Sequence, residues 1–126
     1  MDAVLLNVSW LAVIAGTVAA FGVSMLWFGP LFGRVWARGS HGIVPPARFP
    51  VAAMGLYLLG TFLMAWLVGA TATINALGTA IMLILATAGF QTSSSLFSQK
   101  TTAAALIDGG IIIVMGVVMI AAQGLL

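Results

Sequence analysis

Apolar residues occur along this chain in four long runs, separated by short segments that are polar or rich in glycine and proline. The first run contains no charged residue between Trp10 and Phe28. Because about 20 apolar residues in an α-helix span the hydrocarbon core of a bilayer, each run is long enough for one membrane-spanning helix. The runs predict helices over residues 5–28, 50–69, 76–98 and 102–124. We therefore expect an all-α fold, an integral membrane four-helix bundle forming a single transmembrane domain over residues 1–126.

The segment after the first run predicts a short helix that lies in the membrane interface. Gly29-Pro30 ends the first helix, because proline lacks the backbone N–H that a helix interior needs. Over residues 31–38, Trp36 and other apolar side chains are expected to face lipid, while Arg34 and Arg38 share the polar side. The residues expected at the lipid headgroups are Trp27, Arg34, Trp36 and Arg38.

Composition identifies lipid as the main solvent and excludes several classes of function. Of the 126 residues, 63% are hydrophobic and 5% are charged, whereas a soluble domain has about 25% charged residues. Four scattered basic residues do not form the basic stripe of a nucleic-acid-binding protein. With no cysteine, no glutamate and one histidine, the chain lacks the residues for a disulfide framework or a protein-bound metal. We expect neither a metal nor any other cofactor.

The positive charges predict how the helices are oriented. Arg34, Arg38 and Arg48 follow the first helix, and Lys100 lies between the third and the fourth. The segments on the other side carry no lysine or arginine, so the positive-inside rule puts both basic loops in the cytoplasm and both termini outside. Because these charges follow the first apolar run and do not precede it, the first helix is expected to be a mature anchor and not a cleaved signal peptide.

Small residues recur at every fourth position of the first helix, and the set is Ala12, Gly16, Ala20 and Ser24. Such a row lets the backbone of another helix approach closely, and this packing drives helix association in lipid. Alanine and glycine are also simply common in membrane helices. We interpret the regular spacing as a packing seam, which in an oligomer would lie between subunits.

The second half of the third helix carries polar residues on one face, at spacings of three and four. Polar groups in hydrocarbon need partners, so this face is expected to point at other helices or at a water pocket. Its members are Thr87, Gln91, Ser94, Ser95 and Ser98.

Asp108 is the one acidic residue within a predicted span. An ionisable group inside the membrane is costly and is by default a candidate functional site. In one interpretation, Asp108 is a proton or cation site with polar neighbours on the third helix. These neighbours are Thr87, Gln91, Ser94 and Ser95. In the other interpretation, Asp108 forms a hydrogen-bonded clasp between the third and fourth helices, where Lys100 or Arg34 can reach it.

The residues from Leu26 to Trp36 read Leu-Trp-Phe-Gly-Pro-Leu-Phe-Gly-Arg-Val-Trp. This stretch resembles a bacterial membrane family catalogued as domain of unknown function 1761, whose first helix ends in Leu-Trp-Tyr-Gly-Pro-Leu-Phe-Gly-Lys-x-Trp. Chain length and four-helix layout also agree. Where the family tends to open its last helix with Ile-Asn-Ala-Gly-Tyr, this chain has Ile107-Asp108-Gly109-Gly110-Ile111. The resemblance therefore implies that Asp108 replaces a neutral amide, which favours the clasp. It also implies a bacterial inner membrane, but no activity.

Two classes of function follow from these features. The first is a non-enzymatic membrane protein that acts as an oligomer or as a small accessory subunit of a larger membrane complex. Its partners are then the lipid bilayer and either itself or other membrane subunits. The second is a small solute or proton transporter or channel that uses Asp108 and the polar face of the third helix. An enzyme acting on lipid stays open, although His41, expected to be solvated in a loop, and Asp108 predict no nucleophilic triad.

Overall fold

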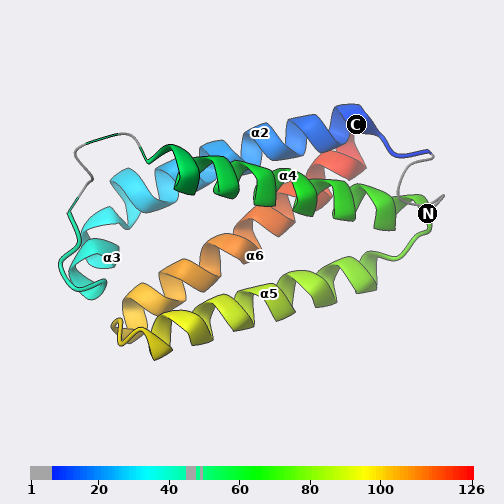
Figure 1. Ribbon diagram of the computed structural model, residues 1–126. Coiled ribbons are helices and arrows are strands. Elements are labelled where there is room, and N and C mark those ends of the chain that lie inside the picture. The colour runs from blue at the N-terminus through cyan, green and yellow to red at the C-terminus, as the bar shows by residue number, and fades with distance from the viewer. Residues whose placement is uncertain (1–6, 45–47, 49) are drawn as a thin grey trace.

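Four long helices and one short helix make up the fold in the computed structural model, which describes residues 7–44, 48 and 50–126 (Figure 1). The elements are α2 (Trp10–Leu26), the π-helical turn η1 (Trp27–Leu31), α3 (Gly33–Gly39), α4 (Val51–Thr73), α5 (Leu77–Phe97) and α6 (Thr102–Leu125). The described residues form no strand. By length and composition, four helices can cross a membrane, the first of them being α2 continued through η1. The predicted all-α membrane bundle, with a short helix after its first span, is confirmed.

The first span begins at Trp10, later than predicted. Asn7 has a positive φ of 63°, and the Ser9 hydroxyl accepts a hydrogen bond of 3.3 Å from the backbone N–H of Ala12. Serine is favoured at such a position because it satisfies one of the N–H groups that a helix start leaves free. Residues 7–9 therefore precede the helix. Residues 5 and 6 of the predicted helix lie outside the described residues.

The end of the first span is a widened turn and not a simple stop. Gly29 has the non-helical angles φ −101° and ψ −105°, and the backbone N–H of Phe32 bonds to the carbonyl of Trp27 at 3.0 Å. Pro30 has no N–H to continue the regular ladder, which explains the break at this point. The short interfacial helix then begins at Gly33, two residues later than predicted, and ends at Gly39.

The second span continues to Thr73, four residues beyond its predicted end. Residues 70–75 lie between the second and third predicted helices. However, the hydroxyls of Thr71 and Thr73 donate to the carbonyls of Val68 and Ala70, at 2.8 and 2.7 Å. Because each hydroxyl finds its partner on the preceding turn of its own helix, the threonines are accommodated there. The chain reverses only at Asn75, which has a positive φ of 54°.

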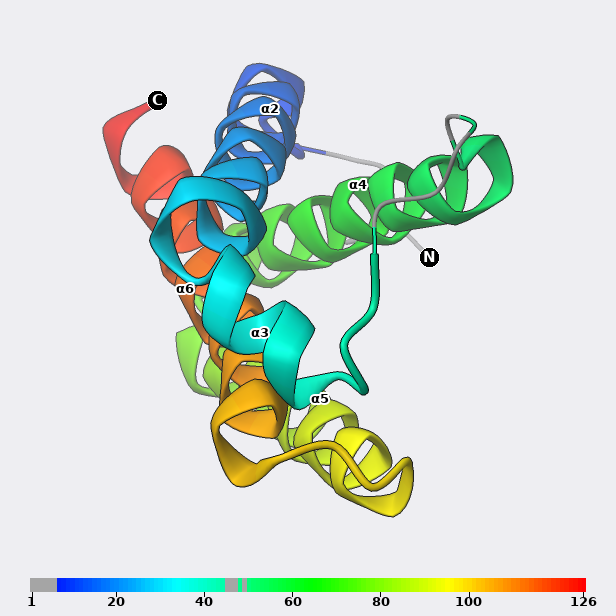
Figure 2. The same ribbon diagram turned by 90° about the vertical axis from the view of Figure 1, so that its left-hand side faces the viewer.

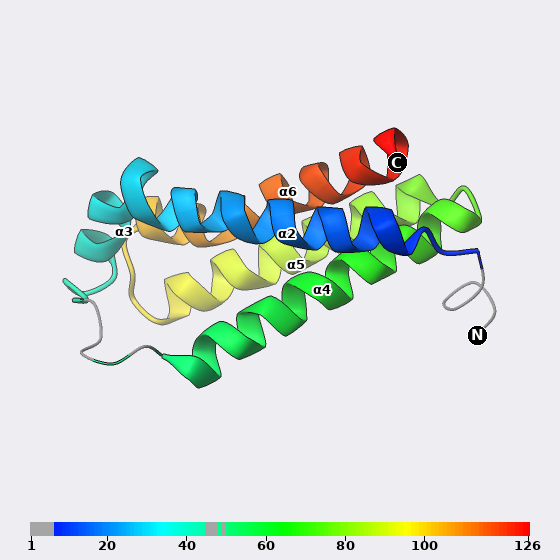
Figure 3. The same ribbon diagram turned by 90° about the horizontal axis from the view of Figure 1, so that it is seen from above.

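The helix α6 is the centre of the bundle. The helices α2 and α5 pack along it, and α4 packs mainly on α2 (Figure 3). Side chains from four helices form the core, with Met115 and Met119 of α6 in its middle. The other fully described core residues are Val8, Val13, Ala20, Ala65, Val68, Ile84 and Ile111.

The predicted packing seam of the first helix lies inside the bundle. All four of its residues are buried, and a Cβ at Gly16 would lie 3.5 Å from the Met119 Cα and from the Ala122 Cβ of α6. The seam members are Ala12, Gly16, Ala20 and Ser24. Small residues therefore allow α2 and α6 to approach each other within one chain. The expectation that this seam forms a contact between subunits is wrong, because α6 already covers it.

The two ends of the bundle differ in charge. The loop after α3 and the α5–α6 loop lie at one end, and the start of α2 and the C-terminus lie at the other (Figure 1). The basic residues Arg34, Arg38, Arg48 and Lys100 therefore share one end, as predicted. Towards this end α4 and α5 diverge, so that α5 keeps α6 as its main neighbour (Figure 2).

Candidate functional site

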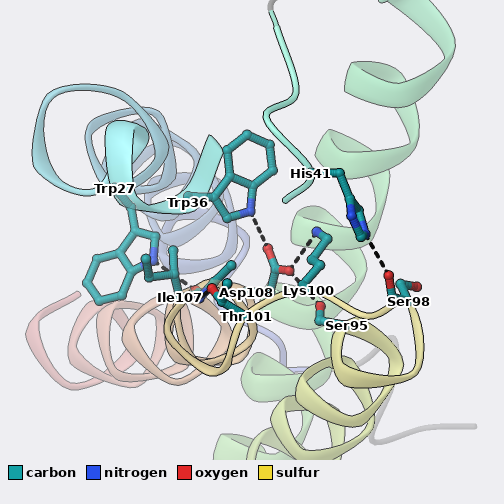
Figure 4. A network of polar contacts seen from close by, with 10 residues as sticks. Trp27, Trp36, His41, Ser95, Ser98, Lys100, Thr101, Ile107 and Asp108 are labelled. Carbon is teal, nitrogen blue, oxygen red and sulfur yellow. Dashed lines mark hydrogen bonds and ion pairs between the residues drawn. The ribbon is translucent and has the colours of Figure 1, made fainter. Parts of the chain in front are cut away.

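Three side chains hold the carboxylate of Asp108, in the second turn of α6 (Figure 4). The indole Nε1 of Trp36 donates to Oδ1 at 2.7 Å. The Ser95 hydroxyl and the Lys100 ammonium donate to Oδ2, at 2.5 and 2.9 Å. We call these four residues the Asp108 cluster. It joins α3, α5, α6 and the α5–α6 loop, so the predicted contact between the third and fourth helices is present and extends to α3.

Burial makes the pairing in the Asp108 cluster important. Asp108 is 6% exposed, and the Lys100 side chain is 21% exposed. A carboxylate without partners in a membrane span would be costly, but here Lys100 neutralises it and two further donors occupy its lone pairs. The Lys100 ammonium also lies 5.3 Å from the centroid of the Trp36 ring, at the distance of a cation–π contact. The cluster is therefore electrically neutral and shielded.

Trp27 and Trp36, the two tryptophans of the segment from Leu26 to Trp36 that resembles the family, bind consecutive residues of α6. Besides the bond from Trp36 to Asp108, Trp27 donates from Nε1 to the carbonyl of Ile107 at 2.9 Å (Figure 4). Both indoles are half-buried, whereas they were expected to face lipid headgroups. Each indole N–H finds its acceptor on α6, and the expected position of the two rings at the lipid headgroups stays a prediction. Arg34 and Arg38 are exposed, as predicted.

Close contacts at its C-terminal end fix α3 to the start of α6. Gly39 is buried, and a Cβ there would clash with the Thr101 hydroxyl and lie 2.7 Å from the Ala104 Cβ. The Thr101 backbone N–H bonds to the carbonyl of Gly39 at 3.0 Å. The exposed His41, predicted to be solvated, places Nε2 2.7 Å from the accepting carbonyl of Ser98. The loop after α3 and the α5–α6 loop are therefore tied together.

The five residues of the predicted polar face of α5 do not share one environment. Ser95 is 3% exposed and reaches Asp108, whereas the other four residues are exposed. These are Thr87, Gln91, Ser94 and Ser98. The expectation that the whole face points at other helices is wrong within one chain, because α5 packs on α6 along a narrow stripe and α4 diverges from it. Among the described residues Arg34 forms no ion pair with Asp108, and Lys100 takes this role.

The chemistry available to the Asp108 cluster is limited. The described residues contain no group of three His, Cys, Asp or Glu side chains that could hold a metal ion. The Asp108 oxygens accept three hydrogen bonds and the residue is 6% exposed, so a proton or a cation would have to reach a carboxylate that is already largely occupied. The geometry is that of a clasp between segments.

Sequence reasoning placed Asp108 and Ser95 together but did not identify Trp36 as the third partner. The signal that could have found it was the spacing of two tryptophans about a glycine-proline break, since each carries an N–H that must be satisfied when buried. Gly109 and Gly110 follow Asp108 in α6. Close contact occurs at Gly109, where a Cβ would lie 3.1 Å from the carbonyl oxygen of Ala88.

These features define a class, a multi-pass membrane protein whose four spans are locked at one end by a short interfacial helix. A family model described as "Protein of unknown function (DUF1761)" matches residues 11–123, and the chain belongs to this family. The resemblance noted in the sequence is thus confirmed. Neither the curated proteins nor the solved structures include a match.

Proposed function

We propose that this protein is a non-enzymatic membrane protein that acts through assembly with other membrane helices. The partner is a second copy of the chain or a larger complex in which the chain is a small accessory subunit. The observation that carries the proposal is a polar stripe on α5, formed by Thr87, Gln91 and Ser94, which the described part of the chain leaves exposed.

The α5 polar stripe is unusual for a surface that faces lipid. Gln91 lies six residues before Phe97, about 9 Å along the helix from its end, and is exposed. In the described part of the chain the Gln91 amide has no hydrogen-bond partner. By contrast, the Thr87 hydroxyl is satisfied by the Leu83 carbonyl at 2.8 Å. Because an amide both donates and accepts, Gln91 can pair with another Gln91 across a two-fold axis.

The Asp108 cluster supports the same proposal because its carboxylate is buried and paired. Its carboxylate is occupied by Trp36, Ser95 and Lys100. Cavities of about 520 and 510 Å³ occur elsewhere in the described chain, and Asp108 lines neither of them. A filled, neutral cluster stabilises a fold, whereas transport and catalysis need an accessible group.

Cysteine crosslinking tests assembly through the α5 polar stripe. The chain has no cysteine, so single cysteines can be introduced without background. Ser94→Cys should form a disulfide-linked dimer in membranes upon mild oxidation. The matched control is Ser93→Cys, which is also an exposed serine but lies about 100° around the helix. It should crosslink several-fold less.

The mass of the crosslinked product distinguishes the two kinds of partner. A product of twice the chain's mass supports an oligomer, and a heavier product containing another protein supports the accessory role. Gln91→Leu should weaken a homodimer about fivefold, the equivalent of about 1 kcal/mol for a polar contact between membrane helices. Equal crosslinking of the two serine positions would contradict assembly through this stripe.

The second candidate is a small solute or proton transporter or channel, and the observation that favours it is an ion pair inside a membrane span. It predicts proton or solute flux in liposomes that contain the purified protein. Asp108→Asn should abolish this flux, because an amide cannot carry the exchangeable proton or the charge. Flux that persists in Asp108→Asn would remove the carboxylate from the mechanism, and absence of flux in the unmodified protein supports assembly instead.

The proposed location is the bacterial inner membrane, with both basic loops in the cytoplasm and both termini outside. Arg34, Arg38, Arg48 and Lys100 at one end of the bundle support it through the positive-inside rule. Reporter fusions next to His41 and to Lys100 should both give cytoplasmic signals.

A further inference from the structure

A cavity of about 520 Å³ lies at the basic end of the molecule, between the break in the first span, α3 and the loop that follows. Aromatic and aliphatic side chains form most of its wall, and Arg34 is the charged residue in its lining. The lining residues are Phe28, Gly29, Gly33, Arg34, Trp36, Ala37, Ile43 and Val44. Its volume is within the usual range for a small-molecule site, about 300–1,000 Å³.

We propose that this cavity binds one anionic phospholipid, with an acyl chain against the apolar wall and the phosphate on Arg34. The apolar wall argues for a hydrocarbon chain, because a free phosphate ion would gain nothing from contact with Phe28 or Val44. The site does not depend on the proposed assembly, since the lining belongs to one chain.

Charge complementarity selects an anionic headgroup. Arg34 and Arg38 are exposed and lie four residues apart, on one side of α3. In the described part of the chain neither arginine has an acidic partner, because the carboxylate of Asp108 is paired with Lys100. The Arg34 guanidinium, which lines the apolar cavity and has no ion pair among the described residues, matches a lipid phosphate, which arginine binds through two parallel hydrogen bonds.

The position of the cavity matches the boundary between hydrocarbon and headgroups. The exposed apolar side chains of Leu31 and Val35 lie beside the exposed Arg34 along the same short segment. Such a mixture is typical of an element that lies in the membrane interface. Trp36 lines the cavity and also donates to Asp108, so the bound lipid would rest on a side chain that the clasp holds in place.

Native mass spectrometry of the purified protein in neutral detergent tests this site, with palmitoyl-oleoyl phosphatidylglycerol and the matching phosphatidylcholine as probes. We expect one bound phosphatidylglycerol, preferred over phosphatidylcholine by about fivefold, the effect of one basic residue near an anionic surface. Arg34→Gln should abolish this preference. Arg48→Gln removes an exposed arginine that does not line the cavity, and it should keep the preference.

Two further experiments distinguish the contribution of the lipid's acyl chain from that of its headgroup. Ala37→Phe places a ring in the cavity and should lower the binding of both lipids several-fold, provided that the variant keeps its helical circular dichroism. Glycerol 3-phosphate added in millimolar excess should displace neither lipid. Equal losses in Arg34→Gln and Arg48→Gln would overturn the proposal in favour of general surface charge. Unchanged binding in a folded Ala37→Phe, or displacement by glycerol 3-phosphate, would also overturn it.

Discussion

Replacing Lys100 with methionine is expected to lower the free energy of unfolding by about 3 kcal/mol, because it leaves a buried carboxylate without its counter-ion. Asp108 is 6% exposed and lies 2.9 Å from the Lys100 ammonium. Trp36 and Ser95 would still donate to the carboxylate, but two neutral donors do not offset a full charge in a membrane span. The measurement is unfolding by sodium dodecyl sulfate in mixed micelles, followed by tryptophan fluorescence.

A double variant separates the ion pair from the loss of a side chain. Lys100→Met combined with Asp108→Leu removes both charges, and replacing a buried ion pair with apolar residues of similar size is often close to neutral. It should therefore recover a large part of the stability that Lys100→Met loses. Arg38→Met is the control for removing a positive charge at the same end, because Arg38 is exposed and has no ion pair among the described residues. Its effect should stay within about 0.5 kcal/mol.

The second large effect is expected at Gly109, where α6 touches α5. Gly109→Ala should cost about 2 kcal/mol, because overfilling a packed interface forces the backbones apart. The new Cβ would clash with the Thr92 hydroxyl and lie 3.1 Å from the carbonyl oxygen of Ala88. Thr92 cannot easily turn away, since its hydroxyl is bonded to that same carbonyl at 2.8 Å. The same unfolding titration measures the loss, and Gly109→Leu should cost more.

Gly89 of α5 provides the matched control for this substitution. It is exposed, and a Cβ built there has no atom within 4 Å. Gly89→Ala should therefore leave stability unchanged or raise it slightly, because alanine loses less conformational freedom on folding than glycine. If Gly89→Ala and Gly109→Ala had equal effects, the close approach of α5 and α6 at Gly109 would not be the cause.

Most of the architecture could be predicted because few backbone structures are stable in lipid. In hydrocarbon every backbone N–H and C=O must be paired within its own segment, so long apolar runs become helices. The predicted helix boundaries were wrong at the start of α2 and the end of α4, because short-range polar contacts influence where a helix begins and ends. Ser9 caps the start of α2, and α4 continues through Thr71 and Thr73, whose hydroxyls bond to carbonyls of the preceding turn. Such contacts depend on the local backbone and leave little trace in hydropathy.

The candidate site was predictable only in part, because its partners come from distant segments. Asp108 was identified from its charge alone, and Ser95 from a polar face on the neighbouring helix. The spacing of Trp27 and Trp36 indicated two N–H groups in need of acceptors, but it did not indicate that Trp36 would donate to Asp108, which lies 72 residues later in the chain. The seam that includes Gly16 was correctly read as a packing surface, but its partner was α6 of the same chain and not another subunit.

By itself, the sequence determined that the chain forms four membrane-spanning helices with its basic residues grouped at one end. The reason is that long apolar runs place the chain in lipid, and a backbone surrounded by lipid must satisfy its own hydrogen bonds, which an α-helix does. Only the tertiary structure decided which polar groups meet. The indole N–H groups of Trp27 and Trp36 found acceptors on α6, while Gln91 and Ser94 stayed exposed. The physical reason is that a polar side chain in hydrocarbon takes whichever partner the packed backbones bring within about 3 Å.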